Sequence, residues 1–182
     1  MNLKDKIHFR EPVRDKFYNG YSPDETVLLR YDGKVGVLTV RDLFILVKPA
    51  ERLVTKSEDI WIKEITEEME VLSRDGFIKL NGMVRRRVYE PLLRIETESK
   101  KCTVVSKSHK IPAMKENEEI LLRADQLKVG DLLYVSELKE NATGLYEKIV
   151  KIEQEENPPL SVYGMATESG GAIISGIFQK SY

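Results

Sequence analysis

This 182-residue chain has only two histidines, and one of them lies close in sequence to a hydroxyl that could share acid–base chemistry with it. His109 lies in the stretch CTVVSKSHKIPAM, with Ser106 three positions before it. If a strand ends there in a tight turn, this spacing lets the hydroxyl and the imidazole face one point. Such a pair could polarise a peptide bond, with the imidazole acting as proton donor or shuttle. The same spacing also suits a structural or solvated histidine.

The other reactive side chains have plainer interpretations. The second histidine, His8, lies in a charged N-terminal stretch and is expected to be solvated. Cys102 is the single cysteine, which excludes a disulfide framework and a cysteine-rich zinc site and favours a core position. The basic triplet at residues 85–87 would alternate between the two faces of a strand, so no nucleic-acid patch is predicted. Since no GxGxxG, P-loop or HExxH motif is present, we predict no cofactor and no metal.

The composition predicts a soluble protein, cytoplasmic or otherwise intracellular. Lys and Arg number 29 against 30 Asp and Glu, for a net charge of −1, so no bulk attraction to nucleic acid or an anionic membrane follows. The longest apolar run is LFILV, far short of the ~20 residues that a membrane helix needs. The charged N-terminus lacks the apolar core of a secretory signal.

Elements that could position His109 are predicted to be strands. Short apolar stretches alternate with turn signals, which favours an all-β domain of at least nine strands. The pairs Asp32-Gly33, Asp75-Gly76 and Asn81-Gly82 each predict a hairpin turn. A short helical turn is expected at residues 41–44. A helix over residues 64–70 and a connecting excursion between strands remain equally open.

We divide the chain into an N-terminal arm, residues 1–20, and one domain, residues 21–182. The arm has little hydrophobic periodicity, and the Asn19-Gly20 turn ends it.

The order of the β segments resembles the Hint superfamily, that is, inteins and the autoprocessing domain of Hedgehog proteins. Those domains have a strand ending in Thr-x-x-His, here Ser106 to His109, and then an Ala-x-x-Leu-x-x-Gly-Asp turn, here Ala124 to Asp131. A final strand pair corresponds to residues 163–182. The resemblance implies a horseshoe of curved β-hairpins with pseudo-two-fold halves. It also implies flanking polypeptide in cis as partner, and termini that converge near a partly buried His109.

The nucleophile of that family is missing from this sequence. Alignment on Thr26-Val27 places Gly20 where family members have Cys or Ser, and a shift of one residue places Tyr21 there. An acyl shift needs a hydroxyl or thiol that closes a five-membered ring on the preceding carbonyl. Glycine has no side chain, and a phenol cannot reach. Ser22 would address the Tyr21 carbonyl, at least one residue out of register.

The C-terminal machinery is altered as well. Lys180 and Ser181 fill the positions of the terminal His-Asn of inteins, and Gly164 replaces an acidic residue. Only Ser106 and His109 correspond to the usual machinery. The sequence therefore predicts a degenerate autoprocessing domain that does not cleave itself and has a structural or regulatory role. Two alternatives stay open: an active single-turnover domain with a substituted or mis-registered nucleophile, and an unrelated β-rich interaction module.

Overall fold

The computed structural model describes residues 20–47, 51–54 and 59–181, and the predicted all-β fold is confirmed. The described residues form fifteen strands, one α-helix and one 3-10 helix. The strands are β1 (Thr26–Tyr31), β2 (Lys34–Thr39), β3 (Glu51–Val54), β4 (Asp59–Glu64), β5 (Met69–Ser73), β6 (Gly76–Arg87), β7 (Leu92–Thr97), β8 (Cys102–Ser106), β9 (Lys110–Lys115), β10 (Glu118–Arg123), β11 (Leu132–Val135), β12 (Leu145–Gln154), β13 (Ser161–Thr167), β14 (Gly171–Ile174) and β15 (Ile177–Lys180). The helices are α3 (Val40–Leu46) and η1 (Ala124–Gln126).

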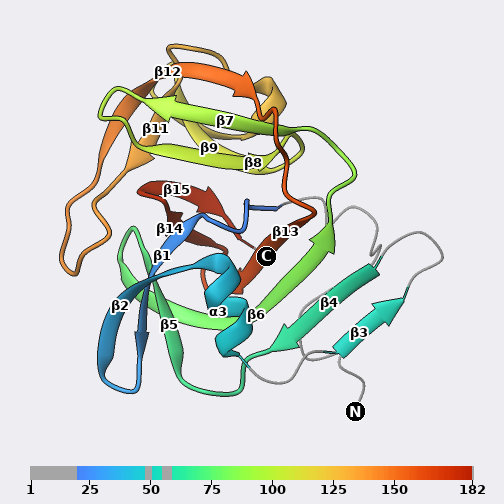
Figure 1. Ribbon diagram of the computed structural model, residues 1–182. Coiled ribbons are helices and arrows are strands. Elements are labelled where there is room, and N and C mark those ends of the chain that lie inside the picture. Colours follow the sequence, from blue (N-terminus) through green and yellow to red (C-terminus); the bar gives the residue numbers. More distant parts are fainter. Residues whose placement is uncertain (1–19, 48–50, 55–58, 182) are drawn as a thin grey trace.

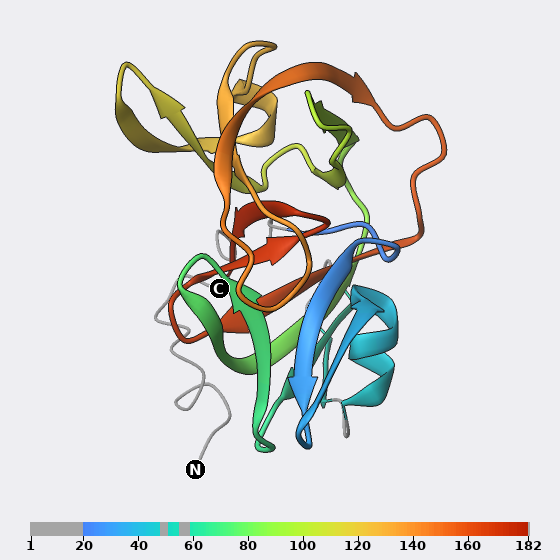
Figure 2. The ribbon, with the colours of Figure 1, turned by 90° about the vertical axis from the view of Figure 1, so that its left-hand side faces the viewer.

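The strands form two antiparallel sheets. One has the order β2-β1-β5-β6-β4-β3, with β13 added to β6; the other has the order β10-β9-β11-β12-β7-β8, with β15 joining β11 and β14 joining β15. The C-terminal strands β13, β14 and β15 lie between the part formed by β1–β6 and the part formed by β7–β12 (Figures 1 and 2). The chain therefore returns at its end to the middle of the molecule.

Tight turns connect the hairpins where the sequence predicts them. Asp32 and Gly33 have φ angles of 48° and 67°, and Gly76 has a φ of 110°. These left-handed conformations favour Gly and Asp, and they match the twist of the strands that the turns join. The hairpin β14–β15 uses the same device at Ser175 and Gly176, with φ angles of 49° and 82°.

One local prediction is wrong. Asn81-Gly82 is not a turn, because it lies inside the continuous strand β6, which pairs with β5, β4 and β13. There, backbone pairing with strands distant in sequence outweighs the local preference. Of the two alternatives for residues 64–70, the structure has the connection between strands and not the helix: β4 ends at Glu64 and β5 begins at Met69.

The core is formed by apolar residues from both sheets. Met69, Leu80, Met83, Ile95 and Leu133 are among its fully buried members. Removing such side chains from water is the main favourable term in folding. The two sheets therefore pack around one shared core.

The predicted helical turn at residues 41–44 is the start of α3. Thr39 caps its N-terminus, accepting a hydrogen bond from the Asp42 amide at 3.0 Å. At the other end, buried Lys63 donates to the carbonyl oxygens of Phe44 and Val47. A cation bonded to these carbonyls stabilises the end of a helix.

The predicted arm, residues 1–20, and His8 fall outside the described residues except for Gly20. Within the part of the chain that the structure describes, no helix is long and apolar enough to cross a membrane.

Candidate functional site

Residues 20–22, which we call the leading segment, run between β8 and β13. Tyr21 exchanges two backbone hydrogen bonds with Tyr163 of β13, at 2.7 and 3.0 Å. The Ser22 amide donates to the Val104 carbonyl of β8 at 2.8 Å, and the Ser106 amide donates to the Gly20 carbonyl at 2.9 Å. This pairing on both sides fixes the leading segment in the middle of the molecule.

His109 lies three residues beyond the end of β8. Its backbone amide donates to the Ser106 carbonyl at 2.8 Å, which closes the turn that the Ser-x-x-His spacing predicts. The imidazole packs against the Tyr21 ring in an edge-to-face arrangement, with centroids 4.8 Å apart. Ser106, His109 and the leading segment therefore meet. Ser106 and His109 are both 0% exposed, so His109 is fully rather than partly buried.

A salt bridge supports this turn from outside. The Glu90 carboxylate accepts a hydrogen bond from the Ser108 hydroxyl and pairs with buried Arg86 at 3.4 Å. The His109 carbonyl accepts from the Ala124 amide at 2.7 Å, at the start of η1. The imidazole is thus held by a turn that is fixed on both sides.

The C-terminal residues reach the same place. The Tyr21 phenol donates to the Lys180 carbonyl at 2.8 Å. Ser181 is 5% exposed, its hydroxyl contacts the Thr167 hydroxyl at 2.5 Å, and its amide donates to the Gly170 carbonyl at 3.0 Å. The structure therefore brings together the backbone of Gly20, the side chains of Tyr21, Ser106 and His109, and the Lys180–Ser181 peptide.

Burial lowers the pKa of His109 from 6.5 to about 3. The nearby Arg86 charge lowers this pKa further, and the Gln179 amide partly offsets the shift. Neither ring nitrogen has a hydrogen-bond partner among the described residues. At neutral pH the imidazole is uncharged and carries no extra proton to deliver.

Gln179 belongs to a chain of buried polar groups that crosses the core. Its amide nitrogen donates to Thr103 Oγ1 at 2.8 Å, and the Thr103 hydroxyl donates to Glu25 Oε2 at 2.7 Å. The other carboxylate oxygen of Glu25 accepts from the Val104 amide at 2.7 Å. Burial raises the pKa of Glu25 to about 7, although these hydrogen bonds act in the opposite direction. We call Glu25, Thr103 and Gln179 the polar chain.

Gly20 and Tyr21, the two residues considered for the nucleophile position, differ in the space around them. A Cβ atom added to Gly20 would lie 2.5 Å from Cγ2 of Val162. The Tyr21 side chain instead points between His109 and Lys180.

Comparison with known proteins points to one fold. No protein-family profile matches the sequence. An intein from a hyperthermophile superposes with a TM-score of 0.75 at 16% identity, covering 90% of this chain and 99% of the intein. The transcription factor IIB Mvu mini-intein gives the same TM-score at 22% identity, with the same coverage. The chain has the Hint fold.

One curated relative is also similar in sequence. Transcription initiation factor IIB of Methanocaldococcus jannaschii is 27% identical over 127 residues, which is 64% of this chain. The match covers only 18% of the length of that factor.

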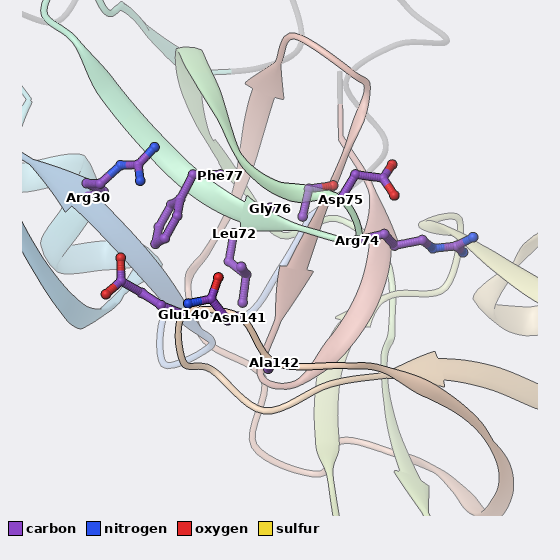
Figure 3. Close-up of a pocket in the computed structure, with 10 residues that line it drawn as sticks. Arg30, Leu72, Arg74, Asp75, Gly76, Phe77, Glu140, Asn141 and Ala142 are labelled. Atoms are coloured by element: carbon purple, nitrogen blue, oxygen red, sulfur yellow. The ribbon is translucent and has the colours of Figure 1, made fainter.

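Open pockets of this Hint fold lie elsewhere. One of about 350 Å³ is lined by Ser22, Glu25 and Cys102, among other residues. A second, of about 540 Å³, lies between the β5–β6 turn and residues 140–142 (Figure 3). Its Arg30 pairs with Glu70 and lies over the Phe77 ring. None of Gly20, Tyr21, Ser106, His109, Lys180 or Ser181 lines either pocket. In the described residues, no group of His, Cys, Asp and Glu could hold a metal ion.

Sequence reasoning missed three buried polar residues near the candidate site: Gln179, Glu25 and Thr167. Gln179 alternates with half-buried neighbours on β15, and Glu25 immediately precedes β1, but a polar residue in or beside a short strand is ordinary. Thr167 ends β13 with no local signal of its contact to Ser181. These groups meet only because β13, β14 and β15 return to the leading segment.

Proposed function

We propose that this chain is a Hint-type protein-autoprocessing domain that has lost its splicing chemistry and serves a structural or regulatory role. Its partner is the flanking polypeptide in cis, whose two ends the domain holds side by side. The observation that carries the proposal is the position of the Tyr21 side chain, which fills the space between His109 and the Lys180 carbonyl.

Tyr21 is the residue proposed to stand at the nucleophile position. The Gly20 carbonyl before it lies next to β8 and accepts from the Ser106 amide. A cysteine here would place its sulfur within a five-membered ring of that carbonyl, whereas the phenol oxygen lies at the far end of a rigid ring. The tyrosine thus preserves the fold around the junction and removes the reaction.

The neutral imidazole supports the same proposal. Proton delivery to a leaving amine contributes about 10²–10⁴-fold in rate where the acid is charged and in place. His109, with a pKa of about 3 and an aromatic ring against it, is not in the charged, acidic form at neutral pH. In this proposal it fills the core instead.

The comparisons support an embedded domain. The match to a transcription initiation factor IIB covers a minor part of that factor, and the solved mini-intein is named for a transcription factor IIB. We propose that the chain is inserted in a longer host polypeptide, whose two halves it keeps adjacent at Tyr21 and Lys180.

The alternative of an active domain with a mis-registered nucleophile has Ser22 as its candidate. Ser22 follows the Tyr21 carbonyl, which accepts from the Tyr163 amide within a strand pairing. Ser22 lines the pocket of Glu25 and Cys102, and His109 does not line that pocket. This placement favours the inert junction.

The test is intact mass spectrometry of the purified chain after overnight incubation with dithiothreitol or hydroxylamine. We expect no cleavage between Gly20 and Tyr21 in the wild type. Tyr21→Cys should produce thiol-dependent cleavage after Gly20. Because this substitution also removes the ring that buries His109, the imidazole can hold a proton again, and adding His109→Ala should slow the cleavage at least tenfold. Cleavage of the wild type at that bond would contradict the proposal.

Two matched variants separate a lost nucleophile from a lost fold. Tyr21→Phe keeps the ring and should remain folded, with the bond between residues 20 and 21 intact. Gly20→Cys should be inert or poorly folded, because its Cβ meets Val162. Cleavage after Asn19 in folded Gly20→Cys would instead show that Gly20 holds the nucleophile position. Circular dichroism checks the fold of each variant.

A further inference from the structure

The peptide bond between Lys180 and Ser181 has reactive groups placed around it that the Gly20–Tyr21 bond lacks. Ser181 carries a hydroxyl on the residue immediately after the carbonyl. The Lys180 carbonyl oxygen accepts a hydrogen bond from the Tyr21 phenol at 2.8 Å. The Ser181 hydroxyl contacts the Thr167 hydroxyl at 2.5 Å. The Ser181 residue is 5% exposed, so these groups meet in a nearly water-free place.

We propose that Lys180–Ser181 is a latent reactive junction, at which the Ser181 hydroxyl attacks the Lys180 carbonyl in an N-to-O acyl shift. The bond from Ser181 Oγ to the Lys180 carbonyl carbon forms, and the bond from that carbon to the Ser181 nitrogen breaks. The hydroxyl proton ends on the freed amine. The product is an isomer, an ester in place of the amide, so the step needs no other reactant.

The geometry supplies two of the contributions that such a step requires. The attack closes a five-membered ring within one residue, which makes it intramolecular. Negative charge develops on the Lys180 oxygen during the attack, and the Tyr21 phenol already donates to that oxygen. Thr167, as the hydrogen-bond partner of Ser181 Oγ, holds the nucleophile in place.

The same phenol therefore has opposite consequences at the two junctions. At Gly20–Tyr21 it replaces a nucleophile, and at Lys180–Ser181 it is a donor to the reacting carbonyl. Asparagine cyclisation remains impossible here, because the residue is serine. The inference goes beyond the proposed function, which concerns the loss of splicing, and a reaction at one bond is measured separately from a reaction at the other.

The experiment uses the full chain with hydroxylamine at neutral pH, a reagent that traps an ester as a hydroxamate. We expect slow loss of the dipeptide Ser181-Tyr182, with the hydroxamate on Lys180, located by intact mass and peptide mapping. Site assignment is essential because hydroxylamine also cuts Asn-Gly bonds, and the chain has two, Asn19-Gly20 and Asn81-Gly82. Incubation in urea should abolish cleavage at Ser181 and not at the Asn-Gly bonds.

Four variants complete the test. Ser181→Ala should abolish the cleavage, and Ser181→Cys should make the same bond thiol-sensitive. Tyr21→Phe should slow the cleavage roughly 100-fold, as expected for loss of one donor to a developing oxyanion. Ser22→Ala, which removes the hydroxyl on the residue after Tyr21, should leave the cleavage unchanged.

Three results would each overturn the inference: an intact Lys180–Ser181 bond in the folded wild type, cleavage that persists in Ser181→Ala, or an undiminished rate in Tyr21→Phe. Cleavage between Gly20 and Tyr21 would bear on the proposed function alone.

Discussion

Two buried titratable side chains lie near opposite ends of the polar chain, and their surroundings differ. Glu25 has a donor for each carboxylate oxygen, the Thr103 hydroxyl and the Val104 amide, both at 2.7 Å. His109 has no hydrogen-bond partner on either ring nitrogen among the described residues, although Gln179 affects its pKa. Glu25 is 6% exposed and His109 0%. The two side chains are thus almost equally buried, but only the Glu25 side chain accepts hydrogen bonds from described residues.

The comparison shows that burial is the dominant influence on the pKa of both groups, with or without hydrogen bonds to the side chain. The pKa of Glu25 rises from 4.5 to about 7 in spite of its donors, and the pKa of His109 falls from 6.5 to about 3. Both groups are therefore pushed toward their neutral forms. Their contributions to the pH dependence of stability have opposite signs, so between about pH 4.5 and 6.5 they oppose each other in the wild type. Single variants should reveal each contribution.

The largest change in the free energy of unfolding with pH is expected from His109. The unfolded chain takes up this proton near pH 6.5 and the folded chain only near 3, so acid favours unfolding. The stability that the neutral imidazole contributes is present above pH 6.5 and is lost as pH falls toward 3. From pH 7 to 4, the wild type should lose about 3 kcal/mol relative to His109→Gln.

Urea unfolding followed by the fluorescence of the single tryptophan, Trp61, measures this difference at each pH. His109→Phe should give the same slope with a different constant offset, because it also removes the titration. A difference that stays flat from pH 7 to 4 would contradict the lowered pKa, because it would mean that His109 takes up its proton at the same pH in the folded and unfolded chains.

Much of the fold could be predicted because its signals are local. Asp32-Gly33 and Asp75-Gly76 specify tight turns through backbone conformations that few residues adopt. Asn81-Gly82 carries the same signal and fails, because β6 is paired on both sides and the chain stays extended there. A turn signal therefore holds where no distant strand competes for the backbone.

In the candidate site too, features set by neighbouring residues could be predicted, and contacts between distant residues could not. The spacing of Ser106 and His109 predicts a turn that the structure contains. The contact of Tyr21 with Lys180 joins residues 159 positions apart, and no local pattern records it. Sequence reasoning also expected His109 to be partly buried, since a histidine beside a turn gives no sign of the tyrosine ring that covers it.

Glu25 should give the second-largest change in the free energy of unfolding with pH, in the direction opposite to that of His109. Its folded pKa of about 7 lies above the unfolded value of 4.5, so the folded chain holds the proton longer. The stability that this proton contributes is present below pH 4.5 and is lost as pH rises to 7. From pH 5 to 7, the wild type should lose about 2 kcal/mol relative to Glu25→Gln.

The exposed Glu118→Gln is the control, and its stability should follow the same pH dependence as the wild type. Parallel curves for wild type and Glu25→Gln would mean that Glu25 is ionised throughout.

The smallest expected change in stability tests whether the polar chain connects Glu25 with the surroundings of His109. Thr103→Val keeps the shape of the side chain and removes the hydroxyl that donates to Glu25 and accepts from Gln179. At pH 6 the Glu25 carboxyl is mostly neutral, and the loss should be about 1 kcal/mol, typical of a neutral hydrogen bond. At pH 8 the carboxylate is charged, and the loss should rise to about 2 kcal/mol, because hydrogen bonds to charged groups are stronger.

Urea unfolding at the two pH values measures both losses, with the exposed Thr143→Val as the matched control, for which we expect no change at either pH. The increase with pH distinguishes a hydroxyl that serves Glu25 from one that only fills space, since a packing defect costs the same whether or not a neighbouring carboxyl is ionised. An equal loss at pH 6 and pH 8 would therefore separate Glu25 from the rest of the polar chain, and the two buried groups would then act independently.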